Sequence, residues 1–270
     1  MIKIECENFS LEQICQSGQC FRMEKLEENK YSVIAFGKYL ELSQKENVII
    51  FECTEQEYND IWKTYFDIDT DYSKIINCVD TEDEYLMAAV AFGSGIRILK
   101  QEPWEMIISF IVSQQNNIKR IRKCINLLCE KYGEKKQNEK GVEYFDFPTP
   151  QALSQATIEE LYECNLGYRS RYIYETSHRI LNGDIDLKSL IKMDYQTARK
   201  ELLKLCGVGV KVADCICLFG LHKTEAFPID THINKVLREQ YPLGFPFDKY
   251  KDYSGIIQQY IFFYDLNANI

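Results

Sequence analysis

The sequence contains no uninterrupted run of about 18 apolar residues, which is the length that a membrane-spanning helix needs. Its first residues, MIKIECENFS, also lack the basic region and apolar stretch of an export signal. We therefore expect a cytoplasmic protein that neither enters a membrane nor is secreted. Hydrophobic residues nevertheless make up 46% of the 270 positions, which is enough to form a buried core.

No pair of the eleven cysteines has the CxxC spacing, and no cysteine follows Cys217. This pattern argues against a tetrathiolate metal site and against an iron–sulfur cluster. An odd number of cysteines in a chain without an export signal also argues against a disulfide framework. We therefore expect reduced thiols.

Positive charge is not in excess, because the net charge at pH 7 is -9. Phosphate binding needs positive potential, so this value argues at first against a nucleic-acid partner. The distribution of charge weakens the argument. Residues 1–100 hold 10 basic and 19 acidic side chains, whereas residues 166–240 hold 12 basic and 9 acidic ones. From charge alone, a solvated surface of mixed charge is still the favoured interpretation.

The first part of the chain shows the pattern of an antiparallel meander. Three β-type runs, YSVIAF, YLELS and VIIFEC, are separated only by GK and QKEN. From Thr54 the period changes, and TEQEYNDIWKTYF begins with a capping box formed by Thr54 and Glu57. This segment is predicted to be helical.

Helical patterns follow almost exclusively after about residue 85. Pro103 suits the first turn of a helix, and Thr157 with Glu160 forms a second capping box. No internal repeat or low-complexity linker interrupts the chain. The predicted fold class is α+β, with an N-terminal sheet-and-helix domain over residues 1–90 and a mainly α-helical region over residues 91–270.

The segment LCGVGVKVADCICLFG, residues 205–220, combines a glycine-flanked turn with an apolar helix. Because DYQTARKELLKL precedes it, the pattern predicts a helix, a hairpin and a second helix. Gly207 and Gly209 allow a sharp turn and leave N–H groups free at a helix start, which is a site for an anion such as DNA phosphate. A simple helix C-cap followed by a new helix would also use glycine.

Lys211 is the more informative residue of this segment. A lysine in the first helical turn opposes the helix dipole, which disfavours the positive form of the side chain. The neutral amine is the form that attacks an electrophile and makes a Schiff base. The alternative is a lysine that extends into solvent or pairs with Asp214.

The run from Leu205 to Asp230 resembles the helix-hairpin-helix DNA glycosylase superfamily, and specifically the 8-oxoguanine DNA glycosylase/lyase family. That family has a lysine directly after the hairpin and an aspartate 19 residues later, and Lys211 and Asp230 match both positions. The resemblance covers most of the chain through SGQCFR, SFIVSQQNNIKRI, LGYRSRYI and GIIQQYIFFYDL. Cys206 departs from the pattern, where proline is frequent, as does glutamine in place of asparagine at 114–115.

The resemblance implies an enzyme that flips 8-oxoguanine out of duplex DNA, preferably opposite cytosine, and excises it. Lys211 would attack C1′ and form an imine, which then allows β-elimination at the abasic site. Breaking the N-glycosidic bond develops oxocarbenium character at the sugar, and a nearby carboxylate stabilises it. Asp230 is the candidate for that carboxylate. It also precedes a predicted helix, where it would act as an N-cap worth about 1 kcal/mol.

The resemblance also implies roles for residues that contact the DNA. Tyr168 would wedge into the duplex, and Arg169 and Arg120 would donate hydrogen bonds to the orphaned cytosine. Gln115 and Asn116 correspond to a polar segment that fills the gap. Residues of these types are more often surface or packing residues, so these roles depend on the resemblance.

The resemblance implies that four residues form the base pocket, although spacing alone would make Phe262 and Cys215 core residues and Gly18 a turn glycine. Phe262 would stack on one face of the flipped base, a contact worth about 1 to 3 kcal/mol, and Cys215 would cover the other face. Cys215 lies four residues after Lys211, so the ammonium could lower the pKa of its thiol. Gln258 would read the Watson–Crick edge, and the carbonyl of Gly18 would accept the N7–H that distinguishes 8-oxoguanine from guanine.

The remaining expectations concern phosphate, cations and partners. His232 matches a family histidine near a phosphate, although a structural histidine fits equally well. The resemblance implies no soluble cofactor, but a structural monovalent or divalent cation could bind the backbone carbonyls of Leu203, Leu205 and Val208. The expected partner is double-stranded DNA containing 8-oxoguanine, bound by a monomer.

Two other functions remain open from the sequence. One is a glycosylase of the same fold for alkylated bases, which would generally lack the lysine at 211. The other is a non-catalytic helix-hairpin-helix DNA-binding module. The presence of Lys211 together with Asp230 argues against both.

Overall fold

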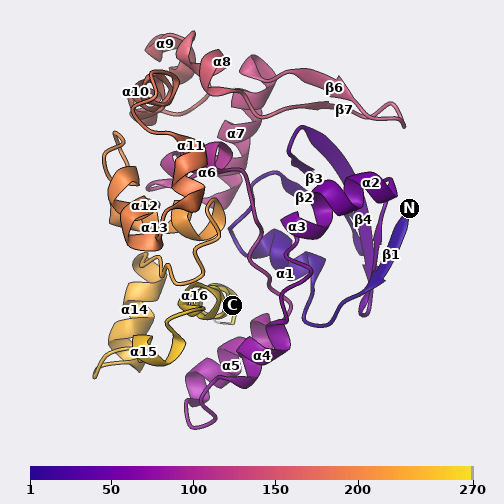
Figure 1. The fold of residues 1–270 in the computed structure, drawn as a ribbon, viewed down its shortest axis with the longest axis vertical. Helices are drawn as coiled ribbons and strands as arrows, with labels where there is room; N and C mark the ends of the chain where they lie inside the picture. Colours follow the sequence, from indigo (N-terminus) through magenta and orange to yellow (C-terminus); the bar gives the residue numbers. More distant parts are fainter. Residues whose placement is uncertain (269–270) are drawn as a thin grey trace.

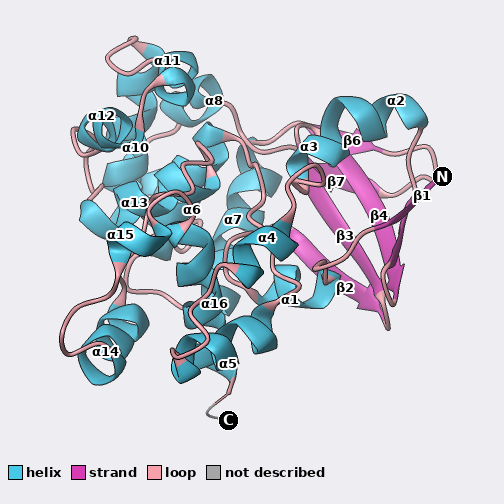
Figure 2. Ribbon diagram, turned by 60° about the horizontal axis from the view of Figure 1, so that its bottom comes forward, coloured by secondary structure: helices cyan, strands magenta, loops and turns pink. Residues whose placement is uncertain are grey.

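The computed structural model describes residues 1–268, and its N-terminal part contains a five-stranded antiparallel sheet. Strands β3 (Lys30–Ala35), β4 (Lys38–Lys45) and β5 (Val48–Phe51) form the predicted meander. The sequence analysis missed β1 (Ile2–Glu5) and β2 (Met23–Glu27), which complete the order β1-β5-β4-β3-β2. In Figure 2 this sheet lies to one side of the helices.

Helices flank the sheet within the same part of the chain. α1 (Leu11–Gln16) follows β1, and the predicted helix after Thr54 consists of α2 (Glu55–Glu57), a π-helical turn (Tyr58–Trp62) and α3 (Lys63–Tyr65). The Thr54 hydroxyl accepts a hydrogen bond from the Glu57 amide at 3.1 Å, as expected for the first half of a capping box. The Glu57 carboxylate pairs with Lys38 at 2.9 Å.

The rest of the fold is mainly helical, as predicted. α6 begins at Pro103, and both halves of the capping box between Thr157 and Glu160 are present at α9. Figure 1 shows how the helices are arranged. They are α4 (Tyr72–Asn77), α5 (Glu84–Gly93), α6 (Pro103–Ser113), α7 (Ile118–Tyr132), α8 (Pro150–Ser154), α9 (Ile158–Tyr162), α10 (Arg169–Leu181), α11 (Leu187–Lys192), α12 (Tyr195–Leu202), α13 (Val210–Phe219), α14 (Thr231–Gln240), α15 (Phe247–Tyr250) and α16 (Ser254–Asn267).

A short hairpin of β6 (Lys135–Gln137) and β7 (Glu143–Phe145) interrupts this helical part. The hairpin contacts the N-terminal sheet (Figure 1). The Tyr144 hydroxyl donates a hydrogen bond to the Gly37 carbonyl at 3.1 Å, and Lys140 lies 3.3 Å from the Glu41 carboxylate. These contacts join the two parts of the molecule.

Two apolar cores lie on either side of this junction. One is formed around the sheet by residues between Phe9 and Phe66 together with Leu99, and the other by residues from the helices together with Phe21. Helix α5 packs against α16. The expected boundary between residues 90 and 91 falls inside α5, and the domain division stays a prediction.

The structure also describes the cysteines, the apolar helices and the possible metal ligands of residues 1–268. None of the eleven cysteines, all of which lie in the described part of the chain, forms a disulfide. Within residues 1–268, no helix is both long and apolar enough to cross a membrane. The same residues contain no group of three or more histidine, cysteine, aspartate or glutamate side chains suited to hold a metal ion.

Candidate active site

The predicted helix-hairpin-helix consists of α12, the turn over residues 203–209, and α13. Gly207 has a φ of 76°, and a Cβ at this position would lie only 2.3 Å from Cδ2 of Tyr172. Glycine is therefore needed here for both backbone conformation and space. Gly209 precedes α13 without any side-chain cap, so the first N–H groups of that helix are left for another acceptor.

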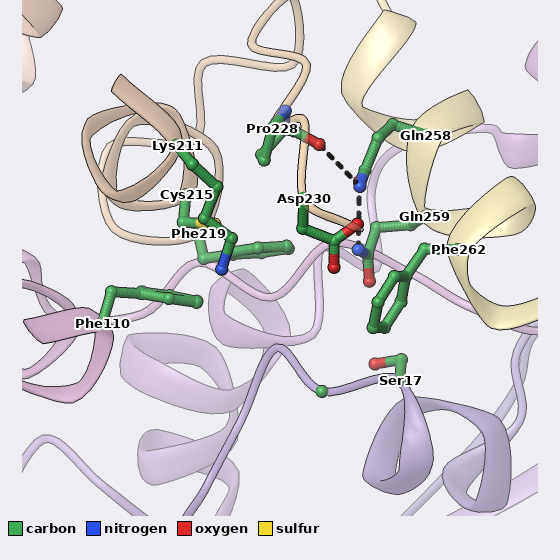
Figure 3. Close-up of a pocket in the computed structure, with 11 residues that line it drawn as sticks. Ser17, Phe110, Lys211, Cys215, Phe219, Pro228, Asp230, Gln258, Gln259 and Phe262 are labelled. Atoms are coloured by element: carbon green, nitrogen blue, oxygen red, sulfur yellow. Dashed lines mark hydrogen bonds between the residues drawn. The ribbon is translucent and has the colours of Figure 1, made fainter. Parts of the chain in front are cut away.

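Lys211 is the second residue of α13, and its side chain enters a pocket (Figure 3). The amine lies 5.6 Å from the centroid of the Phe110 ring. The alternative of an ion pair with Asp214 is wrong, because that carboxylate accepts hydrogen bonds from Arg199 at 2.6 Å and from the Tyr195 hydroxyl at 2.8 Å. Lys211 therefore faces the pocket and not the outer side of its helix.

The pocket is an open hollow where five separate segments of the chain meet. It brings together both expected catalytic residues and all four expected base-binding residues. Its lining consists of Ser17, Gly18, Phe110, Lys211, Cys215, Phe219, Pro228, Asp230, Gln258, Gln259 and Phe262. Figure 3 shows their side chains converging from the segment after α1, from α6 and α13, from the loop before α14, and from α16.

Asp230 occupies the N-cap position of α14, as expected. One carboxylate oxygen accepts a hydrogen bond from the Ile233 amide at 2.8 Å. This bond orients the side chain, and the carboxylate still lines the pocket that contains Lys211. The capping and pocket-lining positions therefore coexist in one residue.

Cys215 lies beside Lys211 on the pocket wall, and the Lys211 ammonium acts to lower the pKa of its thiol, as expected, but the net pKa is raised. Burial raises the pKa of the Cys215 thiol to about 11, and this effect outweighs the favourable influence of the Lys211 ammonium. The side chain is 3% exposed, so the anion would lose most of its hydration. Near neutral pH the pocket therefore contains a neutral thiol at this position.

Gly18 lies in a left-handed backbone conformation with a φ of 76°. The next residue, Gln19, is fully buried and anchors this segment. Its side-chain amide donates hydrogen bonds to the Ser17 hydroxyl and to the Arg97 carbonyl, both at 2.9 Å. Its own backbone carbonyl accepts a hydrogen bond from the Gln101 amide at 2.8 Å. Sequence reasoning missed Gln19, because its partners Arg97 and Gln101 lie about 80 positions away.

Phe262 lies across the pocket from Lys211 (Figure 3), and it contacts His232, which is paired with Asp265. The ring of His232 contacts Phe262 edge-on, with 5.9 Å between the centroids. The Nδ1 atom of His232 lies 2.9 Å from the Asp265 carboxylate, and Lys235 lies 3.2 Å from it. Burial acts to raise the pKa of Asp265, but the bonds from His232 and Lys235 together keep it below its ordinary value. His232 therefore has a defined orientation next to the pocket.

Arg169 is 4% exposed and holds the loop between α6 and α7. Its guanidinium donates hydrogen bonds to the carbonyls of Gln114 at 3.0 Å, Gln115 at 3.3 Å and Leu166 at 3.2 Å. It also lies 4.6 Å from the centroid of the Tyr168 ring. Contact between Arg169 and an orphaned base stays a prediction, since the guanidinium is used within the protein here.

The other expected DNA contacts lie near this loop. Tyr168 is 48% exposed at the start of α10, and Arg120 is exposed in the first turn of α7. Gln115 is exposed and has a positive φ of 45°, whereas the Asn116 amide donates a hydrogen bond to the Val112 carbonyl at 3.1 Å. These residues lie on two segments of the chain that the hydrogen bonds of Arg169 join.

Two known families match successive parts of the chain. Residues 1–107 match the N-terminal domain of 8-oxoguanine DNA glycosylase, and residues 108–245 match the HhH-GPD superfamily of base excision DNA repair proteins. This chain belongs to the 8-oxoguanine DNA glycosylase family. An N-glycosylase/DNA lyase of Saccharomyces cerevisiae is 35% identical over 90% of this chain and 71% of the relative.

Two further relatives support the same assignment to the glycosylase family. A probable N-glycosylase/DNA lyase of Methanothermobacter thermautotrophicus is 30% identical over 87% of this chain and 80% of the relative. The solved structure of the Clostridium acetobutylicum 8-oxoguanine glycosylase/lyase, in complex with DNA containing cytosine opposite 8-oxoguanine, has a TM-score of 0.92. It is 36% identical, and the match covers 100% of this chain and 99% of that one.

Within the glycosylase fold, sequence reasoning missed five residues of the pocket lining. Phe110 and Phe219 were counted only as helix-forming apolar residues, although their rings stack with 5.4 Å between centroids. Ser17, Pro228 and Gln259 carried no signal of their own in the sequence. Membership of the pocket depends on which segments meet in space, and that cannot be read from residue type.

Proposed function

We propose that this protein excises 8-oxoguanine from duplex DNA and then nicks the strand at the resulting abasic site. One observation carries the proposal: Lys211, Asp230, Gly18, Cys215, Gln258 and Phe262 converge on one pocket in a member of this glycosylase family. Cytosine is the proposed opposite base, which is supported by the DNA in the related Clostridium acetobutylicum complex.

In the proposed reaction, the neutral amine of Lys211 forms a bond to C1′ as the bond between C1′ and the base breaks. Asp230 stabilises the positive charge that develops at the sugar in this step. The attached nitrogen then releases a proton, and its lone pair opens the C1′–O4′ bond while O4′ takes up a proton, which gives a protonated imine. This imine acidifies the neighbouring C2′–H, so that loss of that proton expels the 3′ phosphate by β-elimination. The nucleophile Lys211 and the stabilising carboxylate of Asp230 both belong to the protein, and the proposed steps need no soluble cofactor.

The pocket residues have complementary recognition roles in this proposal. Phe262 stacks on one face of the flipped base, and the neutral thiol of Cys215 covers the other face. The Gly18 carbonyl accepts the N7–H of 8-oxoguanine, whereas N7 of guanine is itself an acceptor and would be repelled. Gln258 contacts the Watson–Crick edge.

The DNA duplex is proposed to bind across the α6–α7 loop and the hairpin. Tyr168 wedges into the stack, and Arg120 and Arg169 contact the orphaned cytosine, with Gln115 and Asn116 beside them. For Arg169 this requires that its guanidinium exchanges carbonyl partners for the base. Phosphate groups are proposed to bind the N–H groups around Gly207 and Gly209 and the side chain of His232.

A structural cation at the hairpin is part of the proposal as well. The carbonyls of Leu203, Leu205 and Val208 would hold it, since hard cations prefer oxygen ligands. The Leu205 carbonyl already accepts a hydrogen bond from the Val208 amide at 3.2 Å, which closes the turn. The cation would neutralise a phosphate near the turn. We further propose a monomer that works in a reducing cytoplasm.

Borohydride trapping on an 8-oxoguanine duplex tests the proposal. The wild-type protein should form a covalent adduct and release the base, whereas Lys211→Gln should do neither and still bind the duplex, because the phosphate contacts remain. Lys188→Gln, on the exposed face of α11, is the matched control and should trap normally.

Three outcomes would contradict the proposal. Normal turnover by Lys211→Gln would exclude the lysine mechanism. Tight binding by the wild type without excision or trapping would favour a non-catalytic DNA-binding module. Release of alkylated bases without covalent trapping would indicate that this protein is a glycosylase for alkylated bases.

A further inference from the structure

Gln259 contains a buried hydrogen-bond acceptor that the protein itself leaves unused. The side chain is 4% exposed and lines the pocket next to Gln258. Its Nε2 atom donates a hydrogen bond to Oε1 of Gln258 at 3.1 Å. Among the residues that the structure describes, no group donates to Oε1 of Gln259.

The orientation of both amides follows from one backbone carbonyl. The Pro228 carbonyl can only accept, so Gln258 must turn its NH₂ group toward it, and the distance is 3.1 Å. Oε1 of Gln258 then faces Gln259, so Gln259 must turn its own NH₂ group toward Gln258 to donate a hydrogen bond. The acceptor Oε1 of Gln259 is therefore left over, and Figure 3 shows this amide on the pocket wall in the view between Gln258 and Phe262.

An unpaired buried acceptor is costly, because it has lost hydrogen bonds to water without replacement. Tyr260, the next residue of α16, also has a buried oxygen without a partner among the described residues, but it does not line the pocket. Gln259 differs because its side chain lines the pocket. Its Oε1 is closed to solvent in the free protein, so a flipped base supplies the missing donor once the amide shifts toward it. The gain on binding is then large for a ligand with an N–H at this place and absent for one without it.

We propose that Gln259 is a second specificity-determining residue, whose Oε1 accepts a hydrogen bond from an N–H group on the Watson–Crick edge of the flipped base. This inference rests on the proposed excision of 8-oxoguanine. That base has two adjacent donors on the edge, N1–H and the 2-amino group. In 8-oxoadenine, position 1 is an acceptor and position 2 has only a C–H, so the same contact is lost.

The proposal divides recognition between two sides of the pocket. Guanine and 8-oxoguanine have the same Watson–Crick edge, so Gln259 selects the type of purine and not its oxidation. The Gly18 carbonyl distinguishes the oxidised base through N7–H. Because the donor of Gln259 is used on Gln258, this residue also keeps the Gln258 amide from rotating.

Single-turnover excision by Gln259→Met tests the inference. Methionine keeps the size and flexibility of the side chain but has no amide. Against 8-oxoguanine opposite cytosine, the variant should be about 10-fold to 100-fold slower than wild type, the range expected for one lost base-edge contact. Against 8-oxoadenine opposite cytosine it should change less than about three-fold, so the preference between the two bases falls.

Two controls accompany this measurement. Borohydride trapping on a pre-made abasic site needs no base recognition, so Gln259→Met should trap there at the wild-type rate. Tyr260→Phe removes a buried unpaired oxygen from the same helix outside the pocket, and it should excise both bases normally. Gln259→Ala should repeat the loss of preference, which excludes an effect of the methionine shape.

The outcomes are distinguishable. Equal slowing on both bases, or slowing on the abasic site as well, would show that Gln259 only supports the pocket and would overturn the inference. An unchanged rate on 8-oxoguanine would do the same. A wild-type protein that neither excises 8-oxoguanine nor traps on an abasic site would instead overturn the proposed function, and the inference with it.

Discussion

Substituting Gly18 by alanine separates base recognition from the stability of the fold. The φ of Gly18 is 76°, a conformation that costs a residue with a Cβ about 1 to 2 kcal/mol. The added Cβ would lie 3.5 Å from Cε1 of Phe262 and 3.7 Å from Cδ1 of Ile118, which are ordinary contact distances. Because nothing overlaps in the free protein, the free energy of unfolding should fall by no more than this backbone strain.

The effect on excision should be much larger. A base that stacks on Phe262 and brings N7–H to the Gly18 carbonyl must enter the space that the methyl group fills. We expect single-turnover excision of 8-oxoguanine to slow by about 100-fold or more, equivalent to about 2.7 kcal/mol of transition-state stabilisation. Imine formation by Lys211 on a pre-made abasic site should stay within about three-fold of wild type, because no base is recognised there.

Urea unfolding, single-turnover excision and borohydride trapping on abasic DNA measure the three quantities. Gly183→Ala is the matched control, since Gly183 has a φ of 79° and nothing within 4 Å of an added Cβ. It should show the backbone strain alone and excise normally. Equal losses of Gly18→Ala on the two DNA substrates would refute the recognition role, and so would excision at the rate of Gly183→Ala.

Three further predictions concern Asp230, Arg169 and His222. Asp230→Asn should keep the hydrogen bond to the Ile233 amide, because asparagine caps as well as aspartate, but should slow excision by about 100-fold or more. If the slower excision were fully explained by a lower urea midpoint, Asp230 would act only as a helix cap. Arg169→Ala should lower the free energy of unfolding by about 2 to 5 kcal/mol, because three carbonyls lose a buried charged donor, and an unchanged urea midpoint would contradict this. The same variant should slow excision most opposite cytosine, and equal slowing opposite all four bases would contradict the contact with the orphaned base. Burial lowers the pKa of His222 from 6.5 to about 4, although Asp67 at 3.6 Å acts to raise it. Between these two pKa values the unfolded state binds more protons, so the stability of the protein should fall as the pH drops from 6.5 to 4. In His222→Gln the urea midpoint should depend less on pH over that range. An equally steep pH dependence in the variant would show that another group causes the effect.

Local patterns in the sequence determined much of the fold. Alternation and short turns specify β3, β4 and β5. Pro103 specifies where α6 begins, and the capping box of Thr157 and Glu160 specifies where α9 begins. These signals are local, because a hydrogen bond between residues three positions apart does not depend on the rest of the chain. The strand β2, sequence MEKLE, and the hairpin of β6 and β7 lack an apolar alternation and form only by pairing with neighbouring strands. They were missed for that reason.

The sequence by itself also determined that Lys211 lies in the first turn of a helix after a glycine hairpin, and its motifs indicated the family and six of the eleven pocket residues. Tertiary structure alone decided how those residues behave. Burial raises the pKa of the Cys215 thiol more than the Lys211 ammonium lowers it. The Arg169 guanidinium donates hydrogen bonds to carbonyls of a loop about 55 positions earlier. The orientation of the Gln259 side-chain amide depends on the Pro228 carbonyl, which lies about 30 positions away from Gln258 in the sequence. Solvation and hydrogen-bond direction are properties of the groups that meet in space, and residue spacing along the chain does not contain them.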